Sequence, residues 1–118
     1  ARLEQLALSL ENLRSNLTDE EHRLILSLRS AHRSIGRLRT QVGLNQQRLE
    51  AERARLKASL VRYEDGDIDN LEVTRAKQTV DDAEINLINT NIDLVIAEEE
   101  YRSLLPPREN VQTKLTPP

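Results

Sequence analysis

The chain has 118 residues, a formal net charge of −3 and no cysteine, and aromatic residues make up only 2% of it. A disulfide scaffold and thiolate metal or redox sites are therefore excluded, and a compact core built on aromatic side chains is disfavoured. The abundance of Ala, Glu, Leu, Arg and Lys is typical of long helices and coiled coils, so we expect an all-α, elongated molecule.

A heptad pattern predicts a first helix over residues 2–64. Its apolar seam, with alternating steps of three and four, runs through Leu24, Leu28, Ala31, Ile35, Leu38, Val42, Asn45 and Leu49. An earlier seam (Leu3, Leu6, Leu10, Leu13 and Leu17) joins it out of phase, as in a stutter. Thr18 and Glu21 also fit a capping box, so a new helix starting at Thr18 is the alternative to a continuous one.

A tight turn is predicted at residues 65–68. Gly66 fits the left-handed position that follows a helix C-terminus. Asp69 is a good N-cap for the next helix, with Glu72 three residues later. Ile68 and Val73 have the spacing of a hydrophobic staple around that cap.

A second helix is predicted over residues 69–105, followed by an irregular, extended tail over 106–118 that begins at Pro106. Its seam continues the same alternation through Val73, Ala76, Val80, Ala83, Leu87, Thr90, Leu94, Ala97, Tyr101 and Leu104. The two seams match as an antiparallel hairpin with unequal arms, in a register that sets Leu49 opposite Ala83. Asn45 then lies opposite Leu87, a polar exception of the kind that fixes register.

Charge supports this pairing. Residues 1–62 hold 12 basic and 7 acidic side chains, whereas residues 63–118 hold 5 basic and 13 acidic ones. Helices of opposite sign attract each other and resist pairing with their own kind.

More apolar surface is present than one hairpin seam can bury. Residues 1–27 have no partner helix in this chain. Further apolar residues lie off the two seams: Ile25, Leu26, Leu44, Ala51, Ala54, Ala58, Ile85, Ile88, Ile92, Val95 and Ile96. We therefore expect additional helices on a second face, supplied by other copies or by further sequence.

The segment from Arg62 to Ala76 resembles the helix tip of the TolC-type outer-membrane efflux proteins. That motif has Tyr, two residues, Gly, two residues and Ser or Thr, followed by a turn rich in Leu and Val that ends in Ala. Here Tyr63 and Gly66 match it, and Asp69, an equally good cap, stands where the family often has Ser or Thr. The stretch from Ala83 to Leu105 is similar to the family's returning helix. The resemblance covers about residues 15 to 105.

The resemblance implies one long helix with its returning helix from a trimeric channel, in the periplasmic part of a Gram-negative outer-membrane protein. Such helices close into a tunnel whose tips meet a periplasmic adaptor and, through it, an inner-membrane pump. The segment 1–105 would be the hairpin, with its tip at 65–68 and a first helix continuous through residues 17–21. Membrane contact would come only through segments missing from this chain.

The resemblance also suggests site residues. The tip residues Tyr63, Glu64, Asp65, Gly66, Asp67, Ile68 and Asp69 would dock the adaptor, and Glu72 and Arg75 would line the aperture. Arg75 stands where some members have an acidic aperture residue, and Ile68 where some carry an Arg that ties neighbouring tips together. From the residues alone, turn formation and capping remain the alternative role of the acidic group.

Two other readings remain open: the hairpin of a periplasmic adaptor (membrane fusion) protein, and a plain structural coiled coil of the spectrin type. Neither an enzyme nor a cofactor is expected, because no nucleophile–base or glycine-rich phosphate constellation occurs. His22 and His32 are too far apart in a helix for a metal pair. The scattered arginines of residues 23–39, in an acidic chain without interleaved aromatics, do not indicate a nucleic-acid partner.

Overall fold

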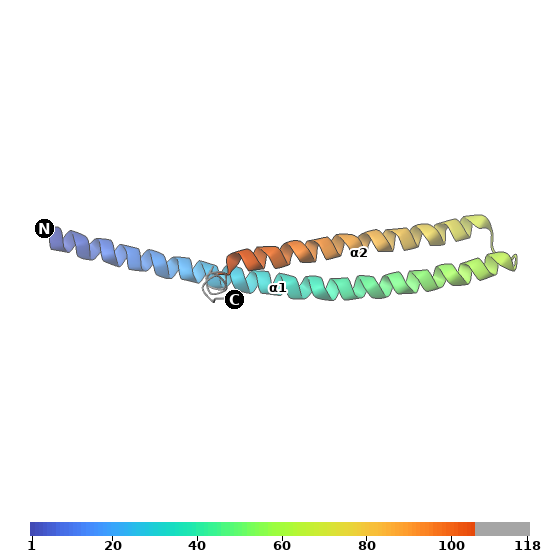
Figure 1. Ribbon diagram of the computed structural model, residues 1–118, viewed down its shortest axis with the longest axis horizontal. Helices are drawn as coiled ribbons and strands as arrows, with labels where there is room; N and C mark the ends of the chain where they lie inside the picture. Colours follow the sequence, from blue (N-terminus) through green and yellow to red (C-terminus); the bar gives the residue numbers. More distant parts are fainter. Residues whose placement is uncertain (106–118) are drawn as a thin grey trace, which may run out of the picture. The chain divides into compact units, whose positions relative to one another are not determined.

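A computed structural model of the chain describes residues 1–105 as two α-helices, α1 (Arg2–Glu64) and α2 (Asn70–Leu104). The helices run antiparallel and are joined by a short turn (Figure 1). No strand occurs between residues 1 and 105, and the predicted all-α hairpin with unequal arms is confirmed. The tail predicted over 106–118 lies outside the described residues.

The first helix, α1, is uninterrupted over 63 residues. It continues through residues 17–21, so a new helix starting at Thr18 is wrong. The Thr18 hydroxyl donates to the carbonyl oxygen of Arg14, one turn earlier, at 3.0 Å and therefore caps no new N-terminus. Gly36 and Gly43 also lie inside α1, because isolated glycines weaken a helix without having to end it.

Residues 34–98 form one compact unit, in which α1 and α2 lie side by side (Figure 1). Its core is a cluster of the buried residues Leu49, Val80 and Ala83, against which Leu56 and Leu87 pack. Leu49 and Ala83, which the sequence sets opposite each other, both belong to this cluster, in agreement with the predicted register. A seam this narrow leaves most of each helix surface open, which is typical of a two-helix coiled coil.

A second unit combines Ala1–Arg33 with residues 99–105. Within it, the five leucines of the early seam, at positions 3, 6, 10, 13 and 17, are between 57% and 83% exposed. These leucines therefore form an exposed apolar seam on α1. Toward the end of α2, the ring centroid of Tyr101 lies 6.4 Å from the ring centroid of His32, and the two rings are tilted relative to each other.

Candidate functional site

The tip of the hairpin, residues 63–69, begins with a tightly capped helix end. Gly66 has a φ of 80°, the left-handed conformation expected from the sequence. Its N–H donates to the carbonyl oxygen of Tyr63 at 3.0 Å, and the N–H of Asp67 donates to that of Arg62 at 2.9 Å. These two bonds form a Schellman motif, which satisfies the last carbonyl groups of α1 and turns the chain sharply.

The start of α2 is capped as predicted. The carboxylate of Asp69 accepts a hydrogen bond from the backbone N–H of Glu72 at 3.1 Å. Ile68 is half-buried, and Val73 is only 3% exposed, which agrees with a hydrophobic staple around the cap. The backbone of the tip is therefore held from both sides.

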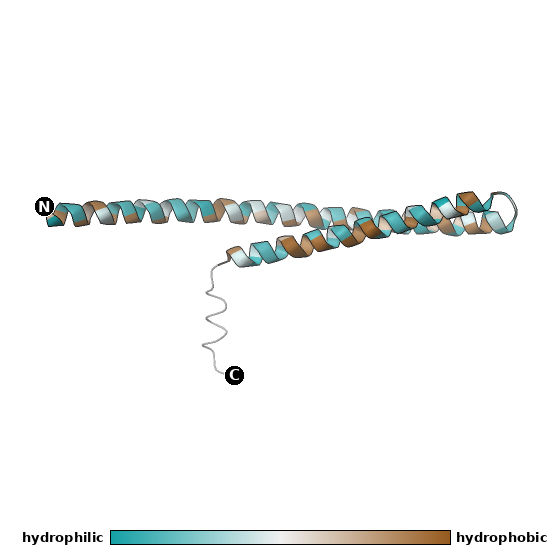
Figure 2. Ribbon diagram, turned by 90° about the horizontal axis from the view of Figure 1, so that it is seen from above, coloured by the Kyte–Doolittle hydropathy of each residue, from teal (hydrophilic) through white to brown (hydrophobic). Residues whose placement is uncertain are grey.

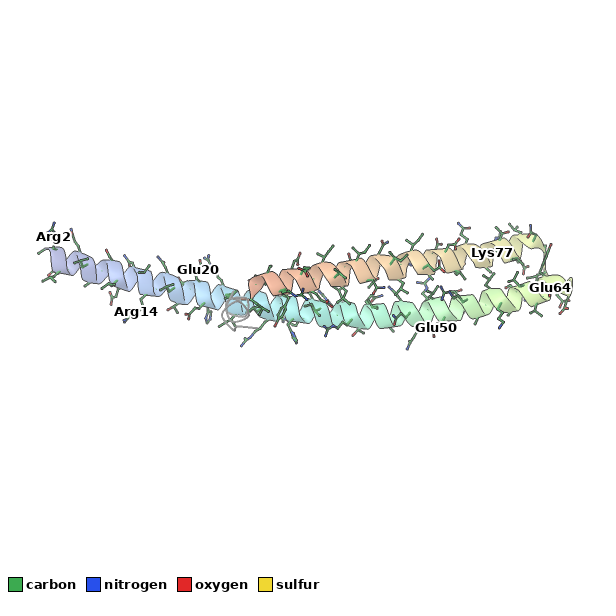
Figure 3. The ribbon with its side chains drawn as sticks, viewed as in Figure 1. Arg2, Arg14, Glu20, Glu50, Glu64 and Lys77 are labelled. Carbon is green, nitrogen blue, oxygen red and sulfur yellow. The ribbon has the colours of Figure 1, made fainter. Side chains whose placement is uncertain are left out.

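The tip gathers most of the site residues suggested by the sequence on one exposed end. Tyr63 is 46% exposed, and the acidic side chains are also exposed: Glu64 (labelled in Figure 3), Asp65, Asp67, Asp69 and Glu72. Within residues 1–105, none of these carboxylates takes part in an ion pair. Only Ile68 is turned inward. The tip is thus an acidic surface on a well-ordered turn.

Glu72 and Arg75, the candidates for an aperture, are both exposed in the first turns of α2. They are three residues apart and lie on neighbouring positions of one helix. Their role in lining an aperture stays a prediction.

Polar contacts cross the hairpin at three levels. Arg53 pairs with Glu84 at 3.1 Å, and Arg39 approaches Glu98 at 3.9 Å. Between these levels, Nδ2 of Asn45 donates a hydrogen bond of 2.7 Å to the hydroxyl of Thr90. All three contacts join α1 to α2.

The bond between Asn45 and Thr90 changes one detail of the predicted register. The sequence set Asn45 opposite Leu87 as an unmatched polar residue. Instead, its amide reaches the next seam position, while Leu87 packs against the cluster of Leu49, Val80 and Ala83. A half-buried donor takes an available acceptor, and the hydroxyl of Thr90 in the seam was the signal that sequence reasoning missed.

A second apolar face, here called the outer seam of α2, consists of Ile85, Ile88, Ile92 and Val95. These side chains are between 51% and 59% exposed, and hydrophobic segments recur along α2 in Figure 2. Ile85 and Leu87 are two positions apart, and each residue turns a helix by about 100°. The outer seam therefore lies nearly opposite the face that packs on α1.

The first helix has a corresponding outer seam, which contains Leu44, Ala51, Ala54, Ala58 and Val61. Leu44 and Val61 are each 54% exposed, and the three alanines are exposed as well. In Figure 3, side chains fill the space between the helices, whereas Glu50 points away from α2. Each helix thus carries one covered and one uncovered apolar face.

The unit of residues 1–33 and 99–105 has an open groove of about 510 Å³. It is lined by Leu26, Leu28, Arg29, His32, Arg33 and Tyr101. Its apolar and cationic side chains are mostly exposed, which makes it a shallow feature of the helix surface.

Residues 1–105 contain no group of three or more His, Asp or Glu side chains placed to hold a metal ion. In the same range, no helix combines the length and the apolar character needed to cross a membrane.

Comparison with known proteins finds no matching family model, and no curated protein or solved structure is significantly similar to the chain.

Proposed function

We propose that this chain is a wall segment of a TolC-type periplasmic tunnel, part of a trimeric outer-membrane efflux or secretion channel. In this role it carries out no catalysis. It supplies one long and one returning helix, which pack side by side with the helices of neighbouring repeats or copies. Any contact with the outer membrane belongs to segments outside this chain.

The observation that carries this proposal is the pair of outer seams. A free two-helix hairpin needs one apolar face on each helix, but α1 and α2 each carry two, on nearly opposite sides. A helix with apolar faces on opposite sides fits between two neighbours, as in a wall or a closed ring. Exposed side chains such as Ile88 (57%) and Leu44 (54%) require such neighbours.

The lengths of the helices favour a channel over an adaptor hairpin. The arms of adaptor hairpins are normally of equal length, whereas α1 has 63 residues and α2 has 35. The leucines of residues 3–17 extend an apolar seam beyond the reach of α2 and call for yet another helix. A plain scaffold explains neither the second faces nor the tip motif around Tyr63 and Gly66.

Lateral packing is tested with pairs of introduced cysteines, because the chain has no cysteine of its own. Leu44→Cys and Ile88→Cys place thiols on the outer seams of the two helices, which face away from each other within one hairpin. If the copies pack side by side as in a wall, mild oxidation should yield a series of disulfide-linked oligomers in which α1 of one copy is joined to α2 of the next. Chains with Ile88→Cys alone provide the control. If α2-to-α2 dimers form as readily as these oligomers, the wall proposal is wrong.

The tip is proposed to dock a periplasmic adaptor through its exposed acidic side chains. Binding of a purified adaptor of a tripartite pump can be followed by fluorescence anisotropy on the labelled chain. We expect Asp65→Lys with Asp67→Lys to weaken binding at least tenfold, and added salt to weaken the parental complex. Glu50→Lys with Asp93→Lys makes the same change in charge at two exposed positions away from the tip, and it should bind like the parental chain. Equal affinity for all variants would contradict docking at the tip.

A further inference from the structure

The contact between Asn45 and Thr90 belongs to a chain of hydrogen bonds across the hairpin. Nε2 of Gln41 donates to Oδ1 of Asn45 at 3.3 Å, and Nδ2 of Asn45 donates to the hydroxyl of Thr90 at 2.7 Å. That hydroxyl donates to the carbonyl oxygen of Asn86 at 2.7 Å. Among residues 1–105, it is the one place where uncharged side chains of the two helices bond to each other.

The two ion pairs between the helices frame this polar layer. Arg39 and Arg53 lie two heptads apart on α1, and their partners Glu98 and Glu84 lie two heptads apart on α2. Asn45 and Thr90 fall near the middle of both intervals. The polar contacts therefore form one pattern that repeats in step with the coiled coil.

The apolar seam alone does not define a unique register. Bulky apolar residues recur every seven positions, at Leu49 and Leu56 on α1 and at Val73, Val80 and Leu87 on α2. A slip of one heptad keeps most apolar contacts, and the turn can lengthen by unwinding residues at a helix end. Degenerate seams of this kind are prone to alternative pairings.

We propose that the layer of Asn45 and Thr90, with its two flanking ion pairs, is a register lock that holds α1 and α2 in this one alignment. A slip of one heptad moves Asn45 away from the hydroxyl of Thr90 and leaves a half-buried donor among apolar neighbours. It also sets Arg53 near Lys77 or Asn91 in place of Glu84. Every slipped register therefore loses both kinds of polar contact.

The register lock affects lateral packing, because the outer seams have to be aligned with neighbouring helices along the helix axis. A hairpin that slips by a heptad shifts Ile85, Ile88 and Ile92 by about 10 Å along α1, at 1.5 Å per residue. Lateral contacts built on the native alignment would then be out of step. This inference concerns pairing within one chain, and it holds whatever the outer seams bind.

The test uses the full chain with three pairs of introduced cysteines. Leu49→Cys with Ala83→Cys reports the native register. Leu49→Cys with Ala76→Cys and Leu56→Cys with Ala83→Cys report slips of one heptad in the two directions. Rates of intramolecular disulfide formation are compared in the parental chain and in a background of Asn45→Leu with Thr90→Val.

We expect the ratio of slipped to native disulfides to rise at least tenfold in the apolar background, while the urea midpoint stays equal or increases. Thr90→Ser retains the hydroxyl and should keep the parental ratio. Gln47→Leu with Thr74→Val makes the same chemical change on exposed positions off the paired seam and should also leave the ratio unchanged. An unchanged ratio in the apolar background overturns the proposal. If that double variant loses its helicity, the nearly isosteric Thr90→Val carries the same test.

Discussion

Gly66 is the residue whose conformation most restricts what can replace it. At a φ of 80° a side chain is disfavoured, although an added Cβ would meet no atom within 4 Å. We therefore expect Gly66→Ala to destabilise the hairpin by about 1 kcal/mol through backbone strain alone. Urea unfolding followed by circular dichroism measures this. Gly66→Asn should cost less, because Asn tolerates the left-handed region; an equal loss for both variants contradicts the explanation.

Gly36 gives the opposite expectation. It lies inside α1 with no positive φ, and a Cβ built there has open space around it. Gly36→Ala should stabilise the isolated chain by up to about 1 kcal/mol, because glycine is the poorer helix former. The same urea experiment tests this at a concentration where the chain is monomeric. A loss of stability would mean that Gly36 adopts a backbone conformation other than the helical one.

Single residues with strong local chemistry could be read from the sequence. Gly66 and Asp69 were predicted correctly because turn and cap preferences depend on a few neighbouring backbone groups. The hydrogen bond from Asn45 to Thr90 was missed because it depends on how far a side chain reaches between two layers of the seam. The opposite charges of the two helices predict that Arg39 and Arg53 pair with acidic residues of α2. They do not predict which acidic residues these are.

At the scale of the element, the start of α2 depends on its cap. Asp69→Ala removes the acceptor of the Glu72 N–H bond, which measures 3.1 Å. We expect a loss of about 1 kcal/mol and faster amide hydrogen exchange confined to the first turn of α2. Asp69→Ser retains an acceptor and serves as the matched control. Faster exchange spread evenly over α2 would show that the cap is not the cause.

The end of α1 and both ends of α2 were predictable to within a residue, because each of these three ends has its own signal at Gly66, Asp69 or Pro106. The continuity of α1 was harder to predict. Around residues 17–21 a slip of the heptad coincides with a capping box, and the two signals point to opposite outcomes. In the structure α1 continues through residues 17–21. The Thr18 hydroxyl bonds to the carbonyl oxygen of Arg14 within the same helix and does not cap a new one.

At the scale of the whole molecule, the sequence predicts that the outer seams need partners but not which partners. An apolar seam attracts any helix of matching shape, because burial of apolar surface has no direction of its own. The choice of partner depends on polar groups placed around the seam, and the specific contacts of these groups form only in the complex. The docking role of the tip has the same limit: its shape follows from Gly66 and Asp69, whereas its partner does not.

Self-association is the property of the whole molecule that the outer seam of α2 should control. Ile88→Glu with Ile92→Glu places two carboxylates on side chains that are 57% and 51% exposed, so the hairpin itself should keep its helicity. In contrast, a neighbouring helix could cover these positions only by desolvating two charges, which costs several kcal/mol per ion in an apolar contact. We therefore expect sedimentation velocity to show association of the parental chain that this variant loses.

The matched control makes the same change in charge elsewhere on α2. Arg75→Gln with Asn86→Glu makes the same change in net charge at two exposed positions that lie off the outer seam, and this variant should associate like the parental chain. If both variants dissociate equally, net charge is responsible and the outer seam is not the contact. If neither dissociates, two apolar faces remain that could hold copies together: the outer seam of α1 and the leucines of residues 3–17, which are between 57% and 83% exposed. If charges at Leu6 and Leu13 then separate the copies, the lateral contact lies on α1 before the hairpin begins.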